Sequence, residues 1–357
     1  MIPRLTLTSV GQVLTEGFDA VIDVRAPAEF AADHLPGAIS LPVLDDDERA
    51  RVGTIYKQVA PFEARKLGAA LVSANAARHI AGPLAGHGGA WRPLIYCWRG
   101  GQRSTSFATI LSQIGWRVSL VEGGYKSWRR LVVDRVQNGP VPRLVVLDGN
   151  TGSGKTAILA ALAAQGVQVL DLEGLANHRG SLFGTMPGGQ PAQTLFEGRL
   201  ASALEGFDPA RPVVVEAESS RIGDLQLPRA IWSALTAGPR IRIDVPLEER
   251  ARFTAATYSE ITADPAEAEA VLDKMTRLHS RETLARWRAM AQARDWAGLA
   301  QVLMAEHYDP RYASHRARYG ARERAAVTVP RLDAAGITAA AGQVAALLAQ
   351  MDAPVTA

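Results

Sequence analysis

Short apolar runs alternate with helix-like stretches through most of the first half of the chain. The apolar runs predict buried strands at residues 20–25, 93–96 and 117–121. Between the last two runs, residues 104–114 predict a helix that ends at Gly115. A strand, a helix and a further strand in this order are typical of a parallel sheet with helical crossovers. We therefore expect an α/β domain with a parallel sheet over residues 1–136.

The same alternation resumes after the polar stretch at residues 137–140. Apolar runs predict further strands at residues 143–148, 167–171, 212–216 and 241–245. Residues 157–165 are rich in Ala and Leu and predict a helix that Gly166 caps. Polar residues fall at the carboxyl ends of these strands, where parallel sheets bind their ligands. We expect a second α/β domain with a helical, basic C-terminal region over residues 137–357.

Composition limits the class of protein. The chain has 357 residues, of which 47% are apolar and 21% charged, so two ordinary globular domains are expected. A single cysteine excludes an intrachain disulfide and a multi-cysteine zinc site. The N-terminus lacks the apolar core of a signal peptide, and no stretch approaches the roughly 20 apolar residues of a membrane span. We expect a cytoplasmic protein with no membrane partner.

The single cysteine, Cys97, follows the predicted strand at residues 93–96 and precedes a glycine-rich turn into a helix. Arg99, Arg103 and the helix N-terminus collect positive charge around the sulfur, which favours its thiolate form. Glycines and arginines are poor core material, so we interpret Cys97 as a nucleophile rather than a structural cysteine. Without a second cysteine to take it, any group that Cys97 receives must leave to another molecule.

Residues 149–156 match the phosphate-binding loop G-x-x-x-x-G-K-[ST], between an apolar strand and a helix. Glycines let backbone amides wrap a di- or triphosphate, a lysine neutralises its charge, and a threonine hydroxyl can hold a magnesium ion. The predicted phosphate-binding residues are Gly149, Gly152, Gly154, Lys155 and Thr156, with Thr156 as the magnesium ligand.

Other candidates flank these two loops. Glu216 and Glu218 end a predicted strand, where a carboxylate serves as a base or holds a metal-bound water; capping or ion pairing is the alternative. Trp98 either stacks on a target base or packs the cysteine loop. A second set of residues is predicted to contact RNA, with a solvated surface as the alternative: His178, Arg179, Arg311, Arg316 and Arg318.

The first 135 residues resemble the rhodanese domain. The matching segments are Asp23-Val24-Arg25 with Glu29-Phe30, the turn at residues 34–39, the cysteine loop, and Gly123-Gly124-x-x-x-Trp128. The resemblance implies a thiol that carries a chalcogen atom. Five residues separate Cys97 from Arg103, one more than in many sulfurtransferases. This spacing resembles that of protein phosphatases, whose loops hold a whole phosphate group. The loop therefore suits a phosphate that bears a chalcogen, and a cysteine phosphatase remains an alternative.

A rhodanese module followed by a P-loop module resembles the bacterial tRNA 2-selenouridine synthases. The motif D-L-E-x-x-A-x-H-R-G-S-x-F-G at residues 171–184 and the segment at residues 215–219 carry this resemblance, although Ala217 stands where we expect an acidic residue. The resemblance implies that selenium replaces sulfur at C2 of a wobble 2-thiouridine, with selenophosphate as the donor. It also implies S-geranylation from geranyl diphosphate, which turns the sulfur into a better leaving group.

From this resemblance we expect Cys97, Arg99 and Arg103 to serve the selenium step, with the thiolate as the attacking group. The phosphate loop then holds either the diphosphate of the prenyl donor or, by the conventional interpretation, ATP. The expected partners are the anticodon loop of tRNA and an enzyme that supplies selenophosphate. The alternatives are an ATP-dependent sulfurtransferase or kinase with a rhodanese-like module, a cysteine phosphatase, and a protein that only binds RNA.

Overall fold

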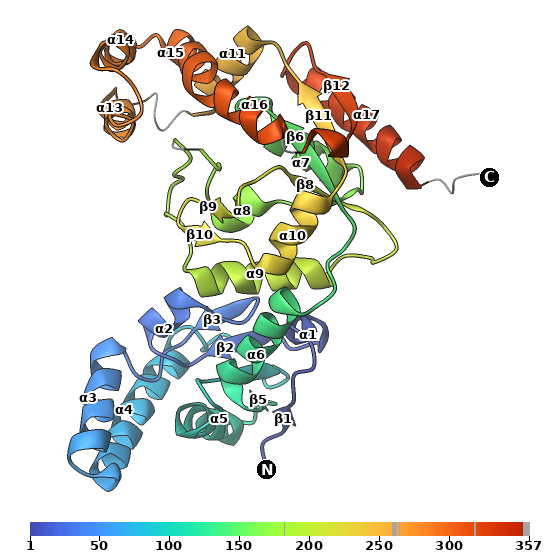
Figure 1. Ribbon diagram of the computed structural model, residues 1–357. Coiled ribbons are helices and arrows are strands. Elements are labelled where there is room, and N and C mark those ends of the chain that lie inside the picture. The colour runs from blue at the N-terminus through green and yellow to red at the C-terminus, as the bar shows by residue number, and fades with distance from the viewer. Residues whose placement is uncertain (182, 259–262, 264, 318, 353–357) are drawn as a thin grey trace. The chain divides into compact units, whose positions relative to one another are not determined.

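The computed structural model describes residues 1–181, 183–258, 263, 265–317 and 319–352, which form two units (Figure 1). The first unit consists of Met1–Pro140 together with Pro191–Gly206, and the second of Val141–Gln190 together with Phe207–Ala357. Each unit has its own parallel sheet and its own apolar core, as the sequence predicts.

The sheet of the first unit has the strand order β1-β5-β4-β2-β3, and its paired strands are parallel. Its strands are β1 (Arg4–Leu5), β2 (Ala20–Asp23), β3 (Ala38–Ser40), β4 (Pro93–Tyr96) and β5 (Ser119–Val121). The three strands predicted in this half are confirmed as β2, β4 and β5. Strand β4 is buried along its whole length, and Cys97 follows it directly at the carboxyl edge of the sheet.

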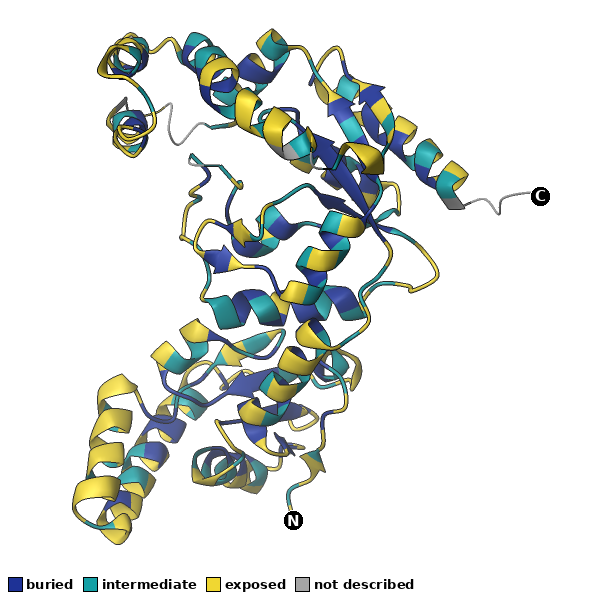
Figure 2. Ribbon diagram, viewed as in Figure 1, coloured by how far each residue is buried: buried dark blue, intermediate teal, exposed yellow. Residues whose placement is uncertain are grey.

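Helices cover this sheet and enclose its core. They are α1 (Gln12–Thr15), α2 (Pro27–Ala32), α3 (Asp46–Gln58), α4 (Pro61–Ala81), α5 (Gln102–Ile114) and α6 (Gly124–Gln137). Helix α5 ends at Gly115 with φ +107°, as the sequence predicts, because glycine adopts this left-handed conformation without steric cost. The pair α3 and α4 was not predicted, and Figure 2 shows that the surface of α3 is largely exposed.

Helix α9 (Gln193–Glu205) belongs to the first unit although it follows the phosphate loop in sequence. The Glu205 carboxylate accepts hydrogen bonds from the amides of Val10 and Gly11 at 2.8 and 2.7 Å. Gly198 leaves room for the ring of Trp128, since a Cβ there would lie 2.8 Å from it. Because α9 belongs to the first unit but lies within the sequence of the second, no single boundary in the sequence separates the two units.

The sheet of the second unit has the order β12-β11-β6-β8-β7, again with parallel pairing. Its strands are β6 (Leu144–Gly149), β7 (Gln168–Leu170), β8 (Val213–Glu216), β11 (Arg240–Asp244) and β12 (Glu323–Thr328). The four strands predicted here are confirmed as β6, β7, β8 and β11. A separate antiparallel ribbon consists of β9 (Arg221–Ile222) and β10 (Leu225–Gln226).

The remaining helices of the second unit cover its sheet and form the expected helical C-terminal region. They are α7 (Lys155–Ala164), α8 (Leu172–Ala176), α10 (Arg229–Ala237), α11 (Leu247–Thr257), α13 (Pro265–Asp273), α14 (Arg281–Gln292), α15 (Trp296–Leu303), the π-helical turn η1 (Met304–Tyr308), α16 (Asp309–Ala317), the 3₁₀ turn η2 (Gly320–Arg322) and α17 (Ala334–Asp352).

Helix α17 departs from the expectation that no stretch is apolar enough to span a membrane. Within the described residues it alone has the length and composition for a span, with a mean hydropathy of 1.3 over Ala334–Met351. Ala341, Val344 and Leu348 of this helix pack in the apolar core of the second sheet. A core helix of this composition passes the same test, so the hydropathy of α17 is weak evidence for a membrane span.

Candidate functional site

The cysteine loop connects β4 to α5 and holds Cys97 against the first turn of the helix. Cys97 is buried, with 3% of its surface exposed. The Ser104 hydroxyl lies 3.1 Å from Cys97 Sγ and 3.2 Å from the Gly101 carbonyl oxygen. A thiol can donate to the Gly101 carbonyl, 3.9 Å away, and a thiolate can accept from Ser104. The loop therefore has a partner for either protonation state of the sulfur.

The turn at Gly123 and Gly124 fixes the backbone of this loop. The amide of Tyr125 donates to the Cys97 carbonyl at 2.8 Å, and the amide of Lys126 donates to the Trp98 carbonyl at 3.0 Å. Gly124 has φ +61°, and a Cβ on it would lie 2.2 Å from the Cys97 carbonyl oxygen. The two glycines thus allow the turn and the cysteine loop to approach closely.

Replacing Gly124 by alanine is expected to destabilise the protein by about 3 kcal/mol, because the added Cβ collides with backbone and the positive φ becomes strained. Urea unfolding followed by tryptophan fluorescence measures the change. Gly101→Ala is the matched control in the same loop, since Gly101 has φ −90° and a Cβ there meets nothing within 4 Å. Equal stability of the two variants would contradict this packing.

The two arginines predicted beside Cys97 have different surroundings. Arg103 is partly buried, and its Nη1 lies 2.8 Å from Glu29 Oε2, which also pairs with Arg49 at 2.9 Å. Burial opposes ionisation of Glu29, but the hydrogen bond from Arg103 and the charges of both arginines hold its pKa below the usual value. Arg99 is exposed at the mouth of the loop. Arg103 is thus held by an acidic partner, whereas Arg99 stands at the surface.

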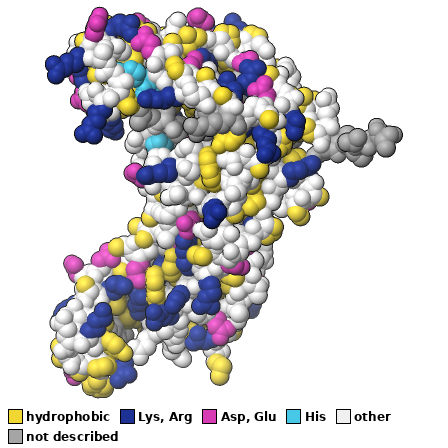
Figure 3. Space-filling view, in the orientation of Figure 1, with side chains coloured by type: hydrophobic (Ala, Val, Ile, Leu, Met, Phe, Trp, Pro, Cys, Tyr) yellow, Lys and Arg dark blue, Asp and Glu magenta, His cyan; other side chains and the backbone are white. Residues whose placement is uncertain are grey.

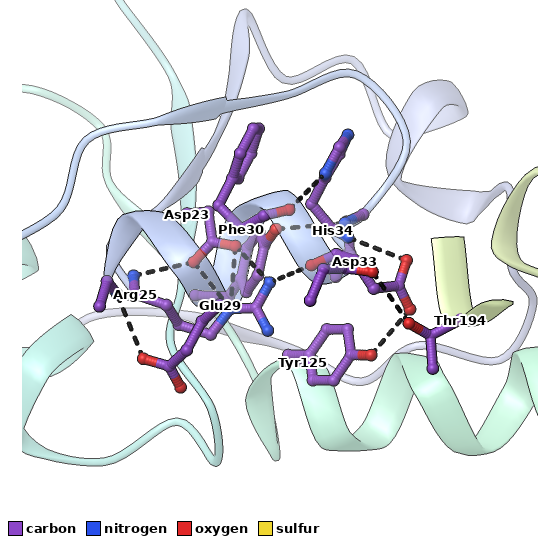
Figure 4. A network of polar contacts seen from close by, with 12 residues as sticks. Asp23, Arg25, Glu29, Phe30, Asp33, His34, Tyr125 and Thr194 are labelled. Atoms are coloured by element: carbon purple, nitrogen blue, oxygen red, sulfur yellow. Dashed lines mark hydrogen bonds and ion pairs between the residues drawn. The ribbon is translucent and has the colours of Figure 1, made fainter. Parts of the chain in front are cut away.

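A buried network centred on Arg25 supports the loop (Figure 4). Arg25 Nη2 lies 2.6 Å from Asp23 Oδ2 and 2.5 Å from the Asp33 carbonyl oxygen. Its guanidinium carbon lies 4.1 Å from the ring centroid of Tyr125, whose hydroxyl donates to Asp33 at 2.7 Å. Trp98 packs with its ring centroid 5.1 Å from that of Tyr125 and is 40% exposed. Packing accounts for one face of Trp98, and its exposed part remains accessible to a ligand.

Asp33 provides a test of this network through pH. Burial raises the pKa of its carboxyl to about 6, although the hydrogen bond from Tyr125 and the charge of Arg129 oppose the shift. The raised pKa means that Asp33 contributes stability that is complete below about pH 4 and is lost as pH rises through 6. Between pH 4 and 7, the free energy of unfolding of the Asp33→Asn variant should fall by about 3 kcal/mol less than that of the unmutated protein. Urea unfolding at the two pH values measures this difference. A pH dependence equal to that of the unmutated protein would contradict this.

The phosphate loop follows β6, the central strand of the second sheet, and runs into α7. Gly152 and Gly154 have φ +79° and +71°, and a Cβ on Gly152 would lie 2.5 Å from Thr254 Oγ1. Lys155 Nζ donates to the Gly149 carbonyl at 3.0 Å. Burial lowers the pKa of Lys155, but Tyr312 and the carboxylates of Glu173, Glu218 and Asp148 outweigh it, so the pKa stays above its usual value. The lysine is therefore charged at the mouth of the loop.

A group of carboxylates lies beside Thr156. The Thr156 hydroxyl donates to Glu173 at 2.9 Å, and the Glu173 amide donates to Glu216 Oε1 at 2.7 Å. Burial, with Asp171 and Glu173 nearby, raises the pKa of Glu216 well above its usual value. Burial and Glu173 raise the pKa of Glu218 to about 8. The predicted pair Glu216 and Glu218 thus stands next to the phosphate loop with a strong tendency to hold a proton.

This arrangement fits a magnesium ion held mainly by a bound phosphate. No group of three or more metal-binding side chains is present among the described residues. Magnesium needs no such group, because it usually keeps several waters and takes one or two protein oxygens with substrate phosphates. Thr156 and Glu173 supply such oxygens, and Glu216 Oε2 is buried with no hydrogen-bond partner among the described residues. The local excess of carboxylate would be relieved by a cation.

The residues predicted to bind RNA divide between several places. Arg316 donates to the Asn150 side chain of the phosphate loop, and Arg311 contacts His307. The guanidinium carbon of Arg179 lies 4.6 Å from the ring centroid of Tyr258. His178 is buried, which lowers its pKa, and its Nδ1 accepts from the amide of Gly180. Arg318 lies outside the described residues.

Figure 3 shows Lys and Arg side chains on the surface of the helical region, with histidines among them. Arg179 and Tyr312 also line a cavity of about 450 Å³ around the phosphate loop. Arg316 contacts that loop directly, so the basic segment contributes to the phosphate site as well as to the surface.

Several residues of the two sites have no strong sequence signal. Ser104 contacts Cys97 and follows Arg103 directly. In the sequence, the phosphatase-like spacing of this loop is the one hint of that contact. Arg250 donates to the Thr151 carbonyl at 3.1 Å and pairs with Asp309 at 2.7 Å. The contacts of Arg250 join segments far apart in sequence, which no local pattern reveals.

Two family models match the chain over separate stretches of its sequence. A model for the rhodanese-like domain matches residues 7–131, and a model described as the tRNA 2-selenouridine synthase AAA domain matches residues 142–282. Together they match the cysteine loop and the phosphate loop.

Relatives named tRNA 2-selenouridine synthase align with about two thirds of the chain. The Aeromonas salmonicida protein is 42% identical over 242 residues, which are 67% of this chain and 64% of that protein. The Alcanivorax borkumensis protein is 40% identical over 248 residues, covering 67% of this chain and 66% of that protein. The Psychromonas ingrahamii protein is 36% identical over 248 residues, covering 68% and 66%. The aligned part is thus slightly less than two thirds of the length of these relatives.

Proposed function

Because the chain belongs to the family of tRNA 2-selenouridine synthases, we propose that it replaces sulfur by selenium at C2 of 2-thiouridine in the wobble position of tRNA. Selenophosphate is the proposed selenium donor, and geranyl diphosphate activates the sulfur first. The observation that carries this proposal is that one chain holds two loops suited to anions. In the cysteine loop the Ser104 hydroxyl lies beside Cys97, and in the phosphate loop Lys155 is charged. The target base is unpaired, because a paired base would be inaccessible.

The first proposed step is alkylation of the sulfur at the phosphate loop. The C2 sulfur forms a bond to C1 of geranyl diphosphate, the C1–O bond breaks, and diphosphate leaves with the electron pair. The loop amides and Lys155 stabilise the negative charge that develops on the diphosphate. Glu218, with a pKa of about 8, is suited to accept the N3 proton of the base as the pH approaches 8, where it loses its own proton. Magnesium held by Thr156 would neutralise further charge on the diphosphate.

The second proposed step releases selenium at the cysteine loop. The Cys97 thiolate forms a bond to the phosphorus of selenophosphate, the P–Se bond breaks, and selenide leaves with the electron pair. Selenide then bonds to C2 of the base, the C2–S bond breaks, and the geranyl thiolate leaves. Water finally cleaves the S–P bond and returns phosphate and free Cys97. Ser104 stabilises the thiolate, and Arg99 and Arg103 stabilise the phosphate oxygens.

Mass analysis of wobble nucleosides tests this function. The purified protein is incubated with tRNA that contains 2-thiouridine, together with selenophosphate and geranyl diphosphate. The proposal expects a mass gain that matches selenium for sulfur, and it expects the S-geranyl nucleoside when selenophosphate is omitted. A nucleoside mass that stays unchanged in both reactions would contradict the proposal.

A cysteine phosphatase is the second candidate, because Ser104 contacts the thiol in a loop of phosphatase-like spacing. That function predicts hydrolysis of a generic aryl phosphate without tRNA and loss of this hydrolysis in Cys97→Ser. The synthase proposal instead predicts that turnover of the cysteine loop depends on tRNA. Release of aryl alcohol with and without tRNA distinguishes the two.

A further inference from the structure

A second, apolar cavity lies beside the phosphate loop. It has a volume of about 70 Å³, and its apolar lining includes Phe183, Ala255, Trp296, Leu299, Leu303 and Met304. These side chains come mainly from α11, α15 and η1 of the second unit, where α11 and α15 lie side by side (Figure 1). None of the six carries a charge. The cavity is therefore suited to a hydrocarbon group rather than to an ion.

The apolar cavity adjoins the cavity around the phosphate loop. Thr151, Ser181, Thr254 and Tyr258 line both of them. Thr151 belongs to the phosphate loop itself, and Thr254 faces Gly152 of that loop. The Thr254 hydroxyl is buried with no hydrogen-bond partner among the described residues, so it can donate to an anion oxygen at Gly152. The border between the two cavities is thus where a phosphate group would join an apolar tail.

We propose that the apolar cavity binds the far end of the hydrocarbon tail of a prenyl diphosphate whose head lies on the phosphate loop. This inference rests on the proposed function, in which the phosphate loop holds the diphosphate of the prenyl donor. It adds the position of the tail and the residues that surround its end. The tail enters between Thr254 and Tyr258, and its last carbons lie among Ala255, Trp296 and Leu303.

The sizes of the two cavities restrict the tail. A water molecule occupies about 30 Å³ in the liquid, so the apolar cavity accepts only a few carbon atoms. The branched end of a short prenyl chain has this size, and the rest of the chain fits the adjoining 450 Å³. The apolar cavity therefore suits the end of the tail, and the adjoining cavity suits the part next to the diphosphate.

A nucleotide base is the competing occupant of this cavity. A base brings several polar edge atoms, and polar ligand atoms are normally matched by convergent polar groups in their pocket. Four polar side chains of the apolar cavity also line the cavity around the phosphate loop, and away from that border only the Trp296 indole and the Tyr308 hydroxyl are polar among its described lining residues. The lining therefore favours a hydrocarbon tail.

Calorimetric titration tests the inference with inorganic diphosphate and with dimethylallyl, geranyl and farnesyl diphosphates. The unmutated protein should bind geranyl diphosphate about 100-fold more tightly than inorganic diphosphate, because each buried methylene adds affinity. Ala255→Leu narrows the cavity and should weaken geranyl diphosphate about 30-fold without changing inorganic diphosphate. Ala256→Leu, at the exposed next position of α11, is the matched control and should bind as the unmutated protein. Trp296→Leu enlarges the cavity and should shift the preference toward farnesyl diphosphate.

Different results overturn the inference and the proposed function. If inorganic diphosphate binds through Lys155 but the tail adds no affinity, the tail site is wrong and the diphosphate site stands. If neither inorganic diphosphate nor geranyl diphosphate binds to a site that Lys155→Ala weakens, the proposed function fails at its first step. If ATP binds more tightly than geranyl diphosphate and loses affinity in Ala255→Leu, the cavity holds a base and the inference is wrong. Because the tail preference is measured on the unmutated protein, the test does not depend on the folding of a variant.

Discussion

Cys97→Ser is expected to abolish selenium incorporation, with a loss of about 1000-fold or more, while S-geranylation of the tRNA continues. Serine preserves the shape of the loop but is a far weaker nucleophile toward phosphorus than a thiolate held by Ser104. The S-geranyl nucleoside should therefore accumulate. Mass analysis of the wobble nucleoside over time measures both products.

Ser104→Ala separates the chemistry of the sulfur from the packing of the loop. Loss of the hydroxyl removes the hydrogen bond to the thiolate and should slow selenium incorporation by about 10-fold. Ser112→Ala is the matched control on the same helix, because its hydroxyl donates to the Thr109 carbonyl at 2.9 Å rather than to Cys97. An undiminished selenium step in Cys97→Ser would exclude the proposed role of the cysteine.

Lys155→Ala is expected to abolish geranylation of the tRNA. Conversion of tRNA that is already geranylated into the selenium-containing product should continue in this variant. The Nζ atom lies at the mouth of the phosphate loop, and several carboxylates hold it charged. Removing this charge should lower the rate of prenyl transfer by about 100-fold or more, because the departing diphosphate loses its main counter-charge. Incorporation of labelled geranyl groups into tRNA measures the loss.

Lys66→Ala is a suitable control for this variant, since Lys66 is 65% exposed and makes a surface pair with Glu63. It should transfer geranyl groups at the unmutated rate. Full geranylation by Lys155→Ala would contradict the diphosphate site. Tight binding of ATP, with hydrolysis stimulated by tRNA, would instead favour the conventional nucleotide interpretation of the loop.

The parts of the fold that the sequence predicts are those with local signals. The apolar runs before Cys97 and Gly149 correspond to β4 and β6, and a left-handed glycine at Gly115 ends α5. Strand β12 was missed because its sequence, ERAAVT, contains no apolar run: its burial alternates along the strand, but only Val327 is fully buried. Its place beside β11 is set by the parallel ladder rather than by its own pattern.

The parts of the site that were missed depend on contacts between distant segments. Glu173 reaches Thr156 and Glu216 because α8 follows β7 at the same sheet edge, which the sequence order alone does not place. Arg250 reaches the phosphate loop from α11 and is held there by Asp309. The apolar cavity likewise needs α11 and the continuous stretch of α15 and η1, which lie far apart in sequence. Motifs predict the loops, whereas the walls around them follow from the tertiary fold.

The central claim is that the two loops perform two separable steps on one tRNA. Its most direct test takes the tRNA produced by Cys97→Ser with geranyl diphosphate, purifies it, and gives it to Lys155→Ala with selenophosphate. The account predicts that the wobble nucleoside gains the S-geranyl mass in the first reaction and becomes 2-selenouridine in the second. A nucleoside that remains S-geranylated in the second reaction, or that never gains the geranyl mass in the first, would contradict the account.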